Sequence, residues 1–132
     1  MNEIFFNNIT MPVLGGCDLC AASEPFYHAD RTVDFNILIY VLEGVIYVTE
    51  DETDYEVTEG ELLILKSGIH HYGKVEIPKG TRWYFIHFYF DENIEIPVFV
   101  PDNSAIRQYE PVRFGAWLPK KMTGLQGSEP ER

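Results

Sequence analysis

The sequence has few basic residues and no long apolar run, and each shortage excludes a class of protein. Lysine and arginine number 10 against 21 acidic residues, which gives a formal net charge of -11 over 132 residues. Nucleic acids and anionic membranes are bound through clustered Lys and Arg side chains, so we expect this chain alone to bind neither. The first 16 residues carry no Lys or Arg, and no stretch approaches the ~20 apolar residues of a membrane span. Both absences favour a cytoplasmic protein without a secretory signal.

Cysteine is also scarce, because Cys17 and Cys20 are the two that the sequence contains. Their CxxC spacing suits a redox pair or half of a zinc site. A structural zinc needs four ligands, however, and the sequence has no second CxxC. The stronger interpretation is two partly buried thiols, and we expect neither a metal nor another cofactor.

Aromatic residues are abundant, with nine Phe, eight Tyr and two Trp, and they favour strands. Short apolar or alternating runs recur between Gly and Pro turns. This spacing, without a helical period, predicts an all-β sandwich or barrel with little helix. The runs at 35–42 and 45–50 read as a hairpin around Glu43-Gly44. Further strands are expected at 55–58, 62–65, 69–75, 82–90 and 94–100.

The run RWYFIHFYF at residues 82–90 carries polar and aromatic groups on one predicted face. In a strand, alternate side chains point to opposite sides. Trp83, Phe85 and His87 therefore share one face. A pocket with aromatic walls and a few polar groups is suited to a polar small molecule. The other interpretation of His87, held equal, is a core histidine satisfied by a backbone carbonyl.

The run GELLILKSGIHHYG at residues 60–73 resembles the second motif of the cupin family, with Gly68 at its turn glycine and His71 at its histidine. The cupin resemblance implies a jelly-roll barrel, also called a double-stranded β-helix. The first cupin motif would place metal ligands at Arg31, Val33 and Ile37, none of which matches the expected ligand. A catalytic metal is therefore not expected.

A closer resemblance spans most of residues 26–90. It rests on Asp30-Arg31, an apolar strand into Gly44, Gly60-Glu61, the run HHYG at 70–73 and Trp83-Tyr84. This order is similar to the N-terminal ligand-sensing domain of AraC-family transcription regulators, the arabinose-responsive type in particular. The resemblance implies a small polar or sugar-like effector inside the barrel and DNA binding by a separate helix-turn-helix domain.

The same resemblance implies that Arg31, Tyr72, Phe85 and His87 contact the effector. We add Trp83, from the same predicted face, and His71, from the paired histidines. For Arg31 the alternative, at even odds, is a surface pair with a neighbouring aspartate. For His71, packing at a turn ranks above ligand contact.

The expected organisation is a barrel over residues 1–101 and a poorly structured, proline-broken tail or linker over 102–132. Residues 1–12 are either an arm over the barrel mouth or an ordinary first strand. No stretch has helix-turn-helix periodicity, so we expect either the sensing part of a longer regulator or a stand-alone cupin, and a homodimer is compatible with both.

The alternative function is a metal-independent sugar isomerase or epimerase with His71 or His87 as general base. It ranks lower because the sequence offers no clearly paired carboxylate. We therefore expect a binding domain without catalytic residues.

Overall fold

The aromatic and β-branched runs form strands, which confirms the all-β class. The computed structural model describes residues 3–7, 12–90 and 115–124, and within these ranges it contains strands and no helix. The strands are β1 (Glu3–Asn7), β2 (Pro12–Ala21), β3 (Asn36–Glu43), β4 (Val45–Glu50), β5 (Thr53–Thr58), β6 (Leu62–Leu65), β7 (His71–Tyr72), β8 (Arg82–Phe90), β9 (Gly115–Pro119) and β10 (Lys121–Met122).

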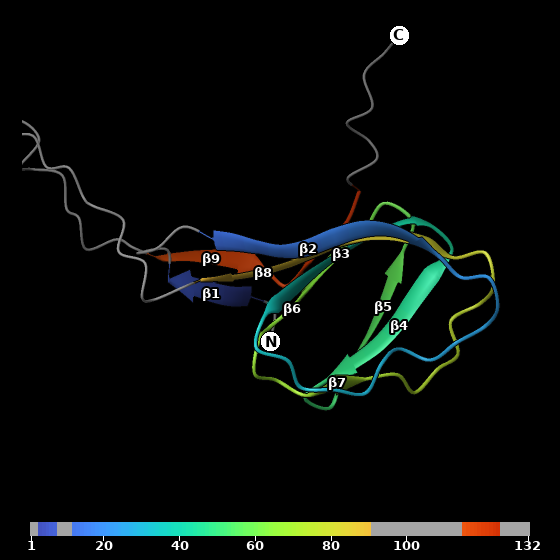
Figure 1. Ribbon diagram of the computed structural model, residues 1–132, viewed down its shortest axis with the longest axis horizontal. Coiled ribbons are helices and arrows are strands. Elements are labelled where there is room, and N and C mark those ends of the chain that lie inside the picture. Colours follow the sequence, from blue (N-terminus) through green and yellow to red (C-terminus); the bar gives the residue numbers. More distant parts are fainter. Residues whose placement is uncertain (1–2, 8–11, 91–114, 125–132) are drawn as a thin grey trace, which may run out of the picture.

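Two sheets enclose the main core. One has the order β10-β6-β3-β8-β2 and the other the order β5-β4-β7. In Figure 1 the long strands β2, β3 and β8 form one layer, and β4, β5 and β7 lie across from them. The core between the layers draws buried aliphatic side chains from both sheets and from the bridge residue Ile77: Ile37, Ile39, Val41, Ile46, Val48, Val57, Leu63, Leu65 and Ile77. Two facing sheets around one core are the architecture that the sequence predicts.

The predicted hairpin at Gly44 is wrong, because β3 and β4 belong to different sheets. The described pairs join β3 to β6 and β8, and β4 to β5 and β7. Gly44 has φ +83°, and a Cβ there would lie 2.9 Å from the Cα of Thr81. The glycine therefore turns a tight corner between the layers, and both flanking strands can bury side chains in one core.

The C-terminal part differs from the expected tail. Within residues 102–132, β9 pairs with β1 and β10 pairs with β6. Between them, Lys120 is buried and forms an ion pair with buried Glu50 of β4. Strands and a buried pair therefore hold residues 115–122 to the barrel.

Other strand predictions differ in extent. The ten-residue β2 was not predicted, and it pairs with β8 along its length apart from a bulge at Gly15. The strand expected at 69–75 is limited to the two residues of β7. The strand expected at 94–100 lies outside the described residues.

The described part of the expected arm is the strand β1 together with Pro12, the first residue of β2. Its Ile4 and Phe6 are buried against Ile64, with Phe88 and Phe90 packed beside them. This second apolar cluster lies where β1 and β9 meet the five-stranded sheet, at the left of Figure 1. Residues 3–7 therefore follow the first-strand alternative.

Candidate functional site

The inner face of β8 provides one wall of a cavity between the sheets. Trp83, Phe85 and His87 all line it, as the period-two pattern predicts. On the neighbouring strand β3, Ile37 lies opposite His87 and Ile39 opposite Phe85. Residues opposite each other in antiparallel strands point to the same side. Aromatic and aliphatic side chains therefore alternate along this wall.

An irregular segment, residues 26–31, forms the opposite wall, and we call it the strap. Its first residue is bridged to Ile77, with Phe26 N donating to Ile77 O at 3.1 Å and Ile77 N donating back at 2.7 Å. Its last residue, Arg31, exchanges two backbone hydrogen bonds with His71, both 3.0 Å long. Bonds at both ends therefore fix the strap beside residues 71–77.

Gly73 explains why the strap can lie so close to residues 71–77. A Cβ at this position would lie 2.6 Å from the backbone nitrogen of His28. A backbone atom between two fixed bridges has little freedom to move aside. The glycine of the HHYG run therefore allows the strap to pack down over the cavity.

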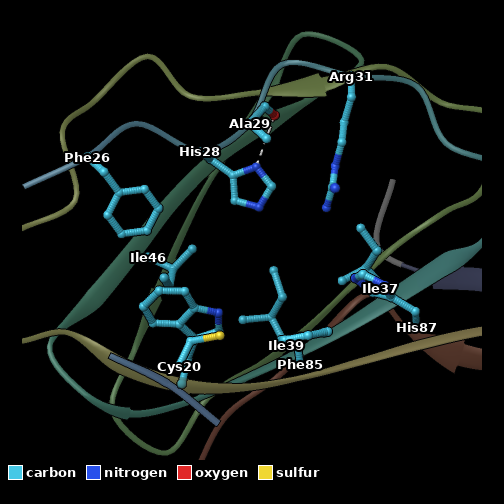
Figure 2. A pocket seen from close by; sticks show the side chains of 11 residues that line it. Cys20, Phe26, His28, Ala29, Arg31, Ile37, Ile39, Ile46, Phe85 and His87 are labelled. Atoms are coloured by element: carbon cyan, nitrogen blue, oxygen red, sulfur yellow. Dashed lines mark hydrogen bonds between the residues drawn. The ribbon is translucent and has the colours of Figure 1, made fainter. Parts of the chain in front are cut away.

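The cavity has a volume of about 270 Å³. In Figure 2, His28 and Arg31 point into it from the strap toward Ile37, Ile39 and Phe85. The same view places Arg31 and His87 at one end and Phe26 and Ile46 at the other. The residues that line it are Cys20, Phe26, His28, Ala29, Arg31, Ile37, Ile39, Ile46, Trp83, Phe85 and His87.

Arg31 is held by a neutral histidine. Its Nε donates to Nε2 of His71 at 3.2 Å, so His71 accepts through Nε2 and carries its proton on Nδ1. The guanidinium carbon lies 6.0 Å from the centre of the Phe35 ring. Asp30, a candidate partner of Arg31, instead contacts His70 at 2.6 Å. Within the part of the chain that the structure describes, no carboxylate forms an ion pair with Arg31.

Three histidines around the cavity favour the neutral form. Burial lowers the pKa of fully buried His71 to about 4, with smaller contributions from electrostatic repulsion by His28, when that ring is protonated, and by Arg31. Burial also lowers the pKa of His28, against a hydrogen bond to Ala29 O that raises it. The pKa of His87 is lowered by burial and then by Arg31. Near neutral pH the fixed charge at the cavity is therefore the guanidinium of Arg31.

The other rings form the apolar walls. Phe26 stacks on Trp83 with ring centres 5.5 Å apart and planes at 23°. At the Arg31 end, His87 contacts the Phe35 ring at 4.3 Å and the Phe85 ring at 4.7 Å. Aromatic pairs at these distances pack favourably, so the walls of the cavity are made of rings in mutual contact.

The structure brings four of the six candidate residues to the cavity: Arg31, Trp83, Phe85 and His87. His71 lies behind Arg31 and orients it without lining the cavity. Tyr72 stacks on His70, with ring centres 5.0 Å apart, and does not line the cavity either. In β7 consecutive side chains point to opposite sides, so buried His71 leaves Tyr72 facing outward.

Sequence reasoning missed His28, Phe26 and Cys20 as lining residues. The first two belong to the irregular strap, which has no periodicity from which a face could be assigned. Cys20 lies opposite Trp83 in the β2–β8 pair, so a prediction of β2 would have found it. Cys17 is exposed, while Cys20 lines the cavity, and both thiols are free. The CxxC spacing on a strand thus sends the two thiols to opposite faces.

Within the described ranges, no group of three or more His, Cys, Asp or Glu side chains is placed to hold a metal ion. Nor do these ranges contain a helix long and apolar enough to cross a membrane. The described residues that line the cavity supply the guanidinium of Arg31, the imidazoles of His28 and His87, the thiol of Cys20 and apolar walls.

Comparison with solved structures finds partial likenesses. The chain is 20% identical to the EutQ protein of Clostridium difficile, with a TM-score of 0.43 over 55% of each chain. It is 16% identical to the conserved SPY1581 protein of Streptococcus pyogenes, with a TM-score of 0.49 over 68% of this chain and 75% of that one. It is 18% identical to a mutant oxalate decarboxylase OxdC of Bacillus subtilis, with a TM-score of 0.41 over 57% and 21% of the two chains.

Sequence comparison is more specific. Residues 17–94 match the profile of the AraC-like ligand binding domain. The chain is also 39% identical over 101 residues to YisR of Bacillus subtilis strain 168, an uncharacterized HTH-type transcriptional regulator. That alignment covers 71% of this chain and 34% of YisR, so the chain spans about a third of the relative's length. The profile covers the strap, the cavity wall of β8 and the HHYG run, which confirms the resemblance and the cupin-type barrel. The chain belongs to the family of AraC-like ligand binding domains.

Proposed function

We propose that the chain is the effector-sensing domain of an AraC-type transcription regulator and binds a small polar or sugar-like molecule in the cavity. The observation that carries the proposal is Arg31, held by His71 and directed into a cavity where no described carboxylate neutralises it. A cavity of this kind, with apolar walls and few polar groups, is typical of small-molecule sites.

Each polar lining residue has a role in the proposal. Arg31 donates hydrogen bonds to the effector through the terminal nitrogens of its guanidinium. His87 and His28, as neutral imidazoles, can each donate one hydrogen bond and accept another. Trp83 and Phe85 pack against the apolar side of the effector. Tyr72 has no role here, because it faces away from the cavity.

In this proposal, DNA is bound by a part of the regulator other than the 132 residues of this chain. The relative YisR is described as an HTH-type regulator, and this chain corresponds to about a third of it. A net charge of -11 disfavours direct contact with DNA by the sensing domain itself. The proposal includes a cytoplasmic location, where the effector and the DNA meet, and a homodimer of the complete regulator.

The enzyme alternative has less support. An isomerase needs an acid and a base on opposite sides of its substrate. The described lining residues include no Asp or Glu that could partner His87, and His71 is occupied with Arg31. Both observations favour a binding role for the cavity.

Thermal unfolding against a panel of neutral sugars, sugar acids, aromatic carboxylates and their amides tests the proposal. A ligand that binds the folded state at a hundredfold excess over Kd stabilises it by about 2.7 kcal/mol. We expect at least one compound class to do so. Replacing His87 by phenylalanine should weaken that effect because the ring is retained and its hydrogen bonds are lost, whereas His70→Phe, outside the cavity, should not.

Protection of Cys20 gives an independent readout of where the compound binds. This thiol lines the cavity, while Cys17 is exposed on the opposite face. A bound effector should slow alkylation of Cys20 and leave that of Cys17 unchanged, as mass spectrometry can measure. Stabilisation without protection of Cys20, or no stabilisation by any class, would contradict the proposal.

A further inference from the structure

We infer that the effector is a small amphipathic monocarboxylate, with its carboxylate at Arg31 and His87 and a flat apolar body against Phe26 and Trp83. This inference rests on the proposed function and narrows its polar molecule to one chemical class. It follows from the distribution of charge and apolar surface along the cavity, which has a cationic end and an apolar end (Figure 2).

The cationic end requires a compensating charge. Asp30 is engaged with His70, and the other described arginine, Arg82, has its own partner in Glu43 at 3.0 Å. Arg31 instead has a neutral histidine on its Nε and the Phe35 ring near its carbon. A partly buried charge without a counter-ion is costly, and a ligand carboxylate would supply the missing partner.

The geometry of Arg31 favours a carboxylate over a single hydroxyl. With Nε engaged by His71, the terminal nitrogens remain for the ligand, and two parallel N–H groups match the two oxygens of a carboxylate. The ring of His87 is available at the same end of the cavity. As a neutral imidazole it can donate a third hydrogen bond to the same group.

The far end of the cavity favours an apolar body. Phe26 and Trp83 form a stacked aromatic pair there, and Ile46 lies beside them. A sugar would direct hydroxyl groups at this wall, where few side chains can pair with them, and unpaired polar groups are costly to bury. An aromatic or branched aliphatic body would bury its surface without that cost.

The size of the cavity sets the size of the body. An apolar cavity of about 150 Å³ is known to hold benzene, with its six carbon atoms. By proportion, about 270 Å³ accommodates about eleven non-hydrogen atoms. A single aromatic ring with a short acid chain has this size.

Matched pairs of compounds test the inference on the full 132-residue chain. The probes are benzoate with benzamide and phenylacetate with phenylacetamide, together with arabinose and inorganic phosphate. Each pair has nearly the same shape and differs in charge. We expect isothermal titration calorimetry to give at least tenfold tighter binding of a carboxylate than of its amide, and tighter binding than of inorganic phosphate.

Two substitutions isolate the guanidinium. Arg31→Gln should abolish the preference for carboxylate over amide, while Arg31→Lys should retain part of it by keeping the charge. The matched control is Arg82→Gln, which removes an arginine whose partner, Glu43, lies outside the cavity lining, and it should leave the preference unchanged. The ratio of carboxylate affinity to amide affinity in the wild-type chain needs no variant. It therefore tests the inference even if Arg31→Gln does not fold.

The outcomes separate this inference from the proposed function. Amides or arabinose that bind as tightly as the carboxylates, with Cys20 protected, would overturn the monocarboxylate and leave the sensing domain in place. Phosphate that binds as tightly as the carboxylates would overturn the apolar body. A panel in which no carboxylate binds would also overturn the inference, whereas the proposed function is judged on the wider panel of compounds.

Discussion

A pH-dependent stability is expected from His71, which is fully buried and neutral. In the folded chain its pKa is about 4, against an ordinary value of 6.5. Between these values the unfolded chain binds a proton that folded His71 does not, so acid favours unfolding. The stabilising contribution is complete above pH 6.5 and is lost as the pH falls toward 4. On lowering the pH from 7.5 to 5, the two pKa values give a loss of about 2 kcal/mol in the free energy of unfolding.

The substitution His71→Gln isolates this effect. Glutamine can accept the Nε hydrogen bond of Arg31 through its side-chain oxygen but does not titrate. We expect the variant to be less stable than wild type at pH 7.5, because its shape fits the site imperfectly, and the difference to shrink by about 2 kcal/mol at pH 5. Urea denaturation at a series of pH values measures both curves.

His28 and His87, whose pKa values are also lowered, add a pH dependence of the same sign that is shared by both proteins. The test therefore compares how much free energy of unfolding wild type loses between pH 7.5 and 5 with how much His71→Gln loses. If wild type and His71→Gln lose the same free energy between pH 7.5 and 5, His71 does not remain neutral in the folded state and the reasoning is wrong. An NMR titration of the His71 ring gives a direct second reading.

Two further substitutions test the packing around the site by urea denaturation. Lys120→Met leaves the buried carboxylate of Glu50 without its cation and should cost about 3 kcal/mol, most of it recovered when Glu50→Gln is added. A loss below 1 kcal/mol would show that the pair is not buried in solution. Gly73→Ala places a methyl group 2.6 Å from the His28 nitrogen and should cost about 2 kcal/mol. Gly16→Ala, with open space around it, should change stability by less than about 0.5 kcal/mol, and equal effects of the two alanines would contradict the close approach of the strap.

The regular wall of the site was predictable because alternation is a local property of a strand. Trp83, Phe85 and His87 follow period two along β8, and this pattern assigns them one face without knowledge of the fold. The same logic would have placed Cys20. It was missed because β2 begins with Pro12 and carries a bulge at Gly15, and these features obscure its alternation.

The strap and the corner at Gly44 were not predictable in this way. Residues 26–31 are positioned by backbone bridges to residues about forty to fifty positions along the chain, and nothing in their own sequence specifies that contact. A glycine after an apolar run fits a hairpin as well as a corner between sheets. The long-range packing on Thr81 decides between them. The strands β9 and β10 were missed for a related reason. Each is short, and each is positioned by pairing with a strand that is distant in the sequence, β9 with β1 and β10 with β6.

The HHYG run indicates the family, yet in this structure its residues serve mainly to build the site. His71 points inward and holds the guanidinium of Arg31. Tyr72 points outward and stacks on His70, and Gly73 makes room for the strap. The roles of His71 and Gly73 are therefore structural and do not depend on which effector binds. In the proposed function, effector specificity therefore depends on side chains outside the motif, above all on Arg31 and on the inner face of β8.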